Sequence, residues 1–130
     1  IMLDYDTPVS ISQHFYNGIM IRAHIHSENG SIWLVGADVC KALQITNPSY
    51  VASKLDKANV KRHFLINSQG KQLVTWYSPR AIYKLCKQSK STRGLDFLKW
   101  YISIQSDYVL IPRETMLKLF DILEKMRSFI

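Results

Sequence analysis

Two Asn-Gly steps, at residues 17–18 and 29–30, interrupt a run of alternating apolar and polar residues that begins near residue 13. Asn and Gly readily adopt the left-handed backbone conformations that the central residues of a tight hairpin turn require. Alternation with a period of two residues is typical of strands that bury one face. The run therefore predicts a meander of three short strands. We place these strands near residues 13–16, 19–26 and 31–35.

Two short helices are expected after the meander. The first is the segment GADVCKAL, at residues 36–43, whose apolar residues share one side of a helix. Asn47-Pro48 then ends one element and begins another, because proline suits the first turn of a helix and disfavours helix in the residue before it. The second helix is therefore the segment PSYVASKL, at residues 48–55.

A second hairpin is expected in the segment KRHFLINSQGKQLVTWYS, which begins at Lys61. Two alternating runs flank the turn at residues 68–70. Ser78-Pro79 then predicts the start of a helix, because serine is a favoured N-cap and proline is favoured at the first helical position.

The helix from Pro79 is predicted to have two unlike faces. Arg80, Lys84 and Lys87 fall within about 60° of one another, at 100° per residue, and the apolar residues lie on the opposite side. This helix therefore has an apolar back and a basic front. The apolar face carries Ala81, Ile82, Leu85 and Cys86.

Two further helices are expected beyond a break at SKSTRG, residues 89–94. The first, over residues 95–105, is apolar on two sides, with Leu95 and Ile102 opposite its wider apolar face. Such a helix is usually sandwiched between elements or shared with a partner. The second, from about Pro112, has apolar residues at alternating spacings of three and four, which fits packing on the domain, dimerisation or a linker. These residues are Met116, Leu119, Leu123, Met126 and Ile130.

The length of 130 residues fits one small α+β domain. Its expected order is an N-terminal β meander, two short helices, a second β-hairpin and C-terminal helices. We assign residues 1–106 to this domain and residues 107–130 to a C-terminal helix that links or dimerises it. No apolar run approaches the ~18 residues of a membrane helix, and the N-terminus does not read as a signal peptide. We therefore expect a cytoplasmic protein that contacts no membrane.

The net charge of +7 is unevenly distributed. Residues 41–99 contain 12 Lys and Arg against two acids, Asp56 and Asp96, whereas the remainder has five basic residues against eight acids. The first part therefore carries a net +10 and the second a net −3. A basic block inside a folded domain attracts polyanions, of which nucleic acid is the commonest.

The sequence lacks the motifs of common catalytic sites. It has no Gly-rich phosphate loop, no Cys-x-x-Cys, no His-Glu-x-x-His and no nucleophile elbow. His24 and His26 would lie on the same face of a strand and could in principle bind zinc with His63, but no fourth ligand and no partner that would orient the histidine rings is evident. Cys40 and Cys86 are expected to be buried free thiols. We therefore predict a protein that is not an enzyme and holds no metal or cofactor.

The order of several motifs resembles the Bro-N domain of phage and baculovirus Bro proteins and prophage antirepressors. The resemblance runs from about Phe15 to Ile104 and rests on IWLVGADVCKAL, NPS, VTWYSPRAIYKLCKQSKS and FLKW in that order. Ala81 stands where the family commonly has glycine, and the sequence after Trp100 loses the usual ending of the domain. The residues that carry the resemblance are Trp33, Val35, Asp38, Val39, Ala42, Leu43, Asn47, Pro48, Ser49, Tyr83, Leu85, Ser89, Lys90, Phe97 and Trp100.

The resemblance implies a small α+β domain involved in DNA binding, usually placed before a variable C-terminal domain and associated in phage with antirepression. We therefore expect the DNA-binding domain of a phage or prophage transcriptional regulator, with double-stranded DNA as partner. Most of its contacts would be to phosphates, which position a protein without specifying sequence. The expected DNA-binding residues are Arg80, Lys84, Lys87, Lys90, Arg93, Lys54, Lys57, Lys61, Arg62 and Lys71.

Two alternatives stay open. A basic surface could instead meet an acidic patch on a phage repressor, so that the chain inactivates that repressor without contacting DNA. The helix that is apolar on two sides and the pattern after Pro112 could also form a homodimer. Aromatic residues near the basic block could stack on bases, although they more often belong to a core. These aromatic residues are Tyr50, Trp76, Tyr77 and Tyr83.

Overall fold

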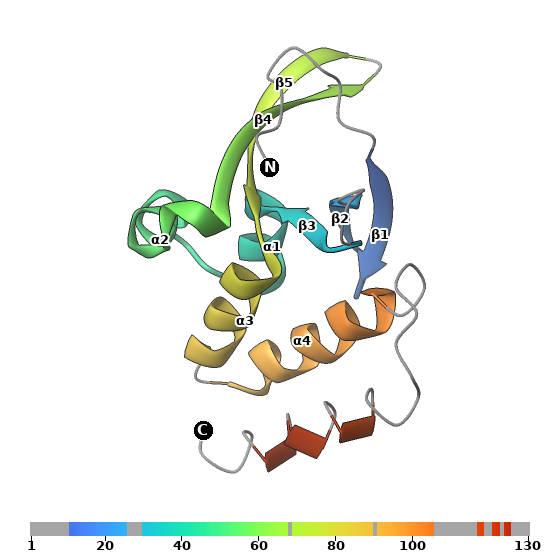
Figure 1. The fold of residues 1–130 in the computed structure, drawn as a ribbon, viewed down its shortest axis with the longest axis vertical. Coiled ribbons are helices and arrows are strands. Elements are labelled where there is room, and N and C mark those ends of the chain that lie inside the picture. Colours follow the sequence, from blue (N-terminus) through green and yellow to red (C-terminus); the bar gives the residue numbers. More distant parts are fainter. Residues whose placement is uncertain are drawn as a thin grey trace.

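The computed structural model describes residues 11–25, 30–67, 69–89 and 91–105, together with 117–118, 121–122 and 124–125. The described part of the chain forms a five-stranded sheet with helices packed on it (Figure 1), which confirms the predicted α+β fold. The strands are β1 (Ser12–Tyr16), β2 (Ile19–Ile25), β3 (Ile32–Val35), β4 (Val60–Asn67) and β5 (Gly70–Tyr77). The helices are α1 (Gly36–Ala42), α2 (Pro48–Lys54), the short 3-10 helix η1 (Lys57–Asn59), α3 (Pro79–Gln88) and α4 (Thr92–Gln105).

The strands form one sheet in the order β1-β2-β3-β5-β4, and every neighbouring pair is antiparallel. The predicted meander is confirmed in β1, β2 and β3. Asn17 and Gly18 connect β1 to β2 with φ of 49° and 80°, the left-handed geometry that an Asn-Gly turn favours. Asn29, in the second Asn-Gly step, lies outside the described residues.

The β4–β5 hairpin extends beyond the rest of the sheet. Its two strands pair along their whole length, from Val60 opposite Tyr77 to Asn67 opposite Gly70. By contrast, β5 pairs with β3 only through Trp76 and Tyr77. The outer part of the hairpin therefore arches away from β1, β2 and β3 (Figure 1).

Helices α1, α3 and α4 cover one face of this sheet and form the main core with it. Helix α4 crosses below the meander (Figure 1), where Tyr101 is fully buried and donates a hydrogen bond to the carbonyl of Ile32. Leu95 and Ile102 are buried as well. The two apolar sides of α4 are thus covered by the chain itself, as expected for a helix sandwiched between elements.

The break before α4 is shorter than predicted. Thr92, Arg93 and Gly94 belong to the helix, and the Ser91 hydroxyl caps it by accepting a hydrogen bond from the Arg93 N–H at 3.2 Å. A Cβ built on Gly94 would lie 2.2 Å from the carbonyl oxygen of Cys86. Gly94, which falls in the predicted break, is therefore needed for the close approach of α4 to α3.

The apolar positions of the predicted last helix all lie outside the described residues. Residues 117–118, 121–122 and 124–125 are helical, and Glu124 forms an ion pair with Lys99 of α4. The assignment of residues 107–130 to a linker or dimerisation element stays a prediction.

Candidate nucleic-acid interface

Helix α3 has the two faces that its sequence predicts. The Ser78 hydroxyl accepts a hydrogen bond from the Ala81 N–H at 3.2 Å, and Pro79 occupies the first turn. The four apolar residues of the predicted back are buried, whereas Arg80, Lys84 and Lys87 are exposed. These three cations form no salt bridge with any residue that the structure describes. The front of α3 is therefore an uncompensated positive surface.

Two hydrogen bonds join the start of α3 to η1, which is 19 residues earlier in the chain. The Ser78 N–H donates to the carbonyl oxygen of Asn59 at 2.9 Å, and the Ser78 hydroxyl donates to Asn59 Oδ1 at 2.8 Å. We call these two bonds the Asn59–Ser78 clamp. The clamp therefore holds η1, which carries Lys57, against the start of α3, which carries Arg80.

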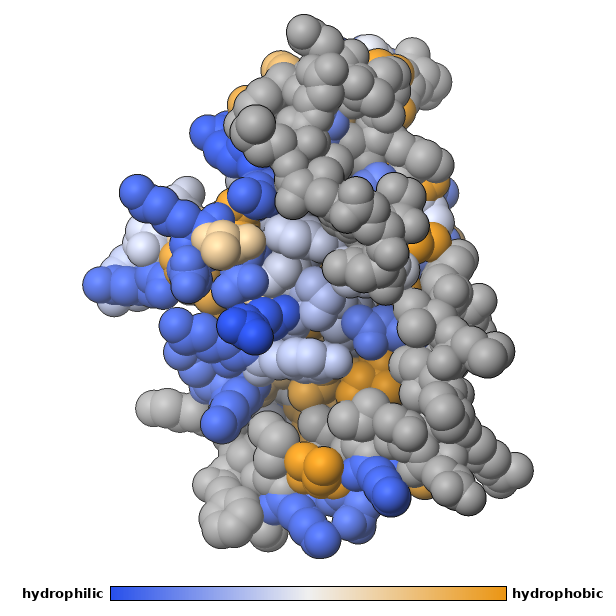
Figure 2. Space-filling model, viewed as in Figure 1, coloured by the Kyte–Doolittle hydropathy of each residue, from blue (hydrophilic) through white to orange (hydrophobic). Residues whose placement is uncertain are grey.

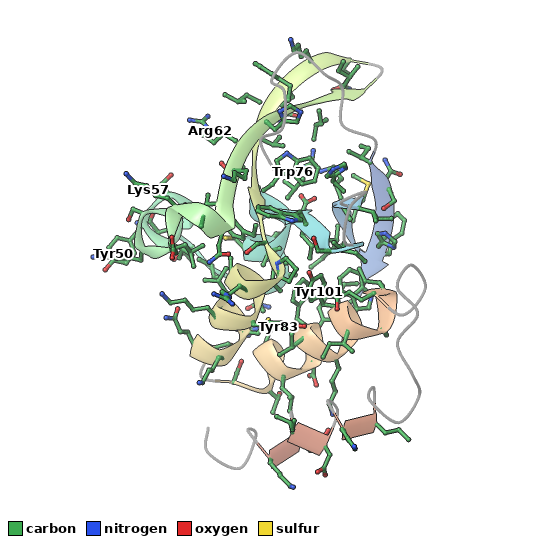
Figure 3. All side chains as sticks on the ribbon, in the orientation of Figure 1. Tyr50, Lys57, Arg62, Trp76, Tyr83 and Tyr101 are labelled. Carbon is green, nitrogen blue, oxygen red and sulfur yellow. The ribbon has the colours of Figure 1, made fainter. Side chains whose placement is uncertain are left out.

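Further basic residues lie on the same side of the molecule. Tyr50, Lys57 and Arg62 all project from the side on which α2, η1, β4 and α3 lie (Figure 3), and Lys54 Nζ of α2 lies 5.4 Å from the centroid of the Tyr50 ring. Figure 2 shows hydrophilic side chains gathered over these elements. We call the surface that these basic side chains form the basic face, and it comprises Lys54, Lys57, Arg62, Arg80, Lys84 and Lys87.

The remaining predicted residues lie elsewhere. Lys61 and Arg62 are neighbours in β4, so their side chains point to opposite faces of the sheet. Arg93 lies in the first turn of α4. Burial raises the pKa of Tyr16, and the positive charge of Arg93 partly offsets this rise. Lys71 lies near the tip of the hairpin, opposite Ile66. Lys90 falls outside the described residues.

A cleft of about 510 Å³ opens between the hairpin and α2. Thr75 and Leu73 of β5 and Arg62 of β4 line one side, and Pro48 and Ser49 of α2 line the other. The cleft therefore connects the hairpin to the basic face, with Arg62 at the junction.

Arg22 also lines this cleft, but its charge is neutralised. Its guanidinium donates to Oδ2 and Oδ1 of Asp38 at 2.9 and 3.0 Å, and its backbone N–H donates to Oδ2 at 2.9 Å. The hydrogen bond to Asp38 raises the pKa of Arg22. Asp38 stands in the first turn of α1, where a carboxylate is favoured in any helix, and no local sequence pattern connects it to a residue 16 positions earlier.

The aromatic residues divide between the core and the surface. Trp76 and Tyr77 are buried, in line with the view that most of them serve the fold. Tyr50 is exposed on α2, and the partly exposed Tyr83 has its ring centroid 6.1 Å from that of Tyr101 in α4. Tyr50 lies beside Lys54 of the basic face, and Tyr83 precedes Lys87 of α3 by one helical turn, so both border this face.

Cys40 and Cys86 are buried free thiols, as predicted. Burial raises the pKa of the Cys86 thiol to about 12 and also raises that of Cys40, so both stay protonated near neutral pH. No three His, Cys, Asp or Glu residues in the described part of the chain are grouped so as to hold a metal ion, and His26 lies outside that part. Over the same residues, no helix has the length and apolar character needed to cross a membrane.

A comparison with protein-family models gives one match, to a family described as the BRO family, N-terminal domain, over residues 21–109. This range covers more than half of the chain and extends from β2 through α4, so it includes the whole basic face. No curated protein and no solved structure matches. The family match confirms the resemblance to the Bro-N domain that the motifs indicate. The chain therefore belongs to the BRO family, and residues 21–109 correspond to the N-terminal domain of that family.

Proposed function

We propose that the chain is the DNA-binding domain of a phage or prophage transcriptional regulator of the antirepressor type, and that its basic face binds the phosphate backbone of double-stranded DNA. Membership of the BRO family supports a nucleic-acid partner. Such a regulator would act in the cytoplasm of the host cell, where its DNA is found.

The observation that carries this proposal is the shortage of acidic residues in the segment that forms the basic face, where Asp56, the N-cap of η1, is the one acid in the sequence from Lys54 to Leu95. Residues 57–95 contain nine Lys and Arg and no Asp or Glu. Ordinary protein surfaces intersperse both signs of charge. The cations of the basic face therefore repel one another, and the binding of an external anion would relieve this repulsion. The row of phosphates along a DNA strand matches the row of cations.

The test is neutralisation of α3, with Arg80→Gln, Lys84→Gln and Lys87→Gln combined. Each lost phosphate contact should reduce the slope of log K against log salt concentration by about 0.9, and affinity at low salt should fall. The measurement is fluorescence anisotropy with random duplex DNA at several salt concentrations. The matched control combines Lys41→Gln, Lys118→Gln and Lys125→Gln, which removes the same charge from exposed positions outside the basic face. An equal loss in both variants would contradict the assignment of the site.

The repressor-binding alternative predicts a different result. A chain that captures a phage repressor in a pull-down, and shifts no duplex DNA at low salt, would be an interaction module. That outcome would contradict the proposal.

A further inference from the structure

The outer part of the β4–β5 hairpin carries large apolar side chains on an exposed face. Side chains alternate along each strand, so His63, Leu65 and Val74 point to one face, where all three are buried. Ile66 and Leu73 point to the other face, where they are 48% and 39% exposed. Exposed apolar residues of this size, close together on a projecting ribbon, indicate a contact surface.

The strand register places basic residues at both ends of these apolar residues. Leu73 lies opposite Phe64, and Ile66 lies opposite Lys71 at the outer end. Lys71 Nζ is 4.3 Å from the centroid of the Phe64 ring. At the inner end Arg62 lies opposite Thr75. From base to tip, the exposed face of the hairpin therefore carries a cation, then apolar side chains, then a second cation.

This arrangement fits nucleic acid better than protein or a second copy of the chain. The hairpin contains no acidic residue, and its inner end lines the cleft that leads to the basic face. Two-stranded ribbons enter DNA grooves, and proteins that bend DNA insert Leu, Ile or Phe between base steps while cations hold the flanking phosphates. Apolar wedges of this kind act from the minor groove.

We infer that the outer half of the hairpin enters the minor groove of duplex DNA, where Ile66 and Leu73 wedge against a base step and bend the duplex. Arg62 and Lys71 bind the phosphates on either side. This inference rests on the proposed DNA-binding function and adds a second contact region to the basic face. The wedge supplies the part of the affinity that salt does not screen.

The test combines Ile66→Thr with Leu73→Thr, because threonine keeps strand propensity at two exposed positions. Energy transfer between dyes at the two ends of a short duplex should rise when the parent protein bends it. The double variant should abolish that rise and weaken binding roughly tenfold. It should leave the slope against log salt unchanged, because no cation is removed. The variant that combines Arg80→Gln, Lys84→Gln and Lys87→Gln should instead show a shallower slope of log K against log salt concentration.

The matched control is Phe15→Thr with Met20→Thr, an opposed pair on β1 and β2 that is 64% and 41% exposed. It should bend DNA like the parent. Thermal unfolding of each variant confirms that the fold is kept.

Each remaining outcome has a definite meaning. If the parent binds duplex DNA and the hairpin variant binds and bends it equally well, the hairpin inference is wrong and the proposed function stands. A parent that binds DNA without bending it, or binds only single strands, also overturns the inference. So does a parent dimer that the hairpin variant converts to a monomer in light scattering. A parent that binds no DNA overturns both proposals.

Discussion

Asp38 accepts three hydrogen bonds from a single residue, Arg22, two from its guanidinium and one from its backbone N–H. The pair joins α1 to β2 across 16 residues, and the two side chains are only 13% and 20% exposed. Truncation of Asp38 would leave a half-buried guanidinium and a strand N–H without their acceptor.

We therefore expect Asp38→Ala to lower the free energy of unfolding by about 2 kcal/mol. Urea denaturation followed by circular dichroism measures this loss. Asp96→Ala, at an exposed position on α4, is the control and should stay within about 0.5 kcal/mol of the parent. Equal midpoints for the two variants would show that the Arg22 contact adds nothing to stability.

The Asn59–Ser78 clamp should matter for both stability and DNA binding. Ser78→Ala removes the N-cap of α3 and one clamp bond, and should cost about 1–2 kcal/mol. Asn59→Ala removes only its side-chain bond and should cost less. Because the clamp fixes η1, which carries Lys57, against the start of α3, Ser78→Ala should also weaken DNA binding measured by anisotropy. Ser12→Ala on β1 is the control for the binding measurement, and an unchanged affinity in Ser78→Ala would contradict a positioning role.

Gly94→Ala should destabilise the protein, although Gly→Ala inside a helix normally stabilises by up to about 1 kcal/mol. The added Cβ would meet the Cys86 carbonyl oxygen, so α3 and α4 must move apart. We expect a loss of about 2–4 kcal/mol, seen as a lower midpoint in thermal unfolding. Asp96→Ala, at an exposed position of α4, is the control for the effect of helix propensity. A Gly94→Ala midpoint at or above that of the parent would rule out the close approach.

The two thiols should resist alkylation in the folded protein. Burial raises the pKa of Cys86 from 9.0 to about 12, so at pH 8 iodoacetamide should modify neither cysteine until urea is added. Mass spectrometry measures the modification. Because the pKa of Cys86 is higher in the folded protein, the unfolded chain loses its thiol proton at a lower pH. The free energy of unfolding should therefore fall as the pH rises from 9 to 12. Rapid labelling of Cys86 at pH 8 would show that it is not buried.

The sequence was sufficient where structure depends on neighbouring residues. The turn at Asn17-Gly18 and the two faces of α3 follow from local backbone preference and from periodicity, and both were predicted correctly. The alternation of β4 also separates Lys61 from Arg62, although both were first assigned to one DNA-binding surface. That distinction was available in the sequence.

Other features depend on packing between distant segments. The start of α4 at Thr92 was not predicted, because the place of Gly94 inside the helix is explained only by its close approach to α3. Likewise, the pairing of Arg22 with Asp38 and the clamp between Asn59 and Ser78 leave no periodic pattern. The basic face needed the fold as well, since α2, η1, β4 and α3 meet only in three dimensions.

The position of the Asn59–Ser78 clamp has a mechanical consequence for the hairpin. Asn59 immediately precedes β4 and Ser78 immediately follows β5, so the clamp closes the hairpin at its base, one step beyond the Val60 and Tyr77 pair. From that pair to Ile66 the strand is about 20 Å long, at about 3.3 Å per residue. The Asn59–Ser78 clamp is thus the point about which the outer part of the hairpin would rotate. A rotation of about 10° at the clamp displaces the tip by about 3.5 Å, close to the ~3.4 Å rise of one base pair.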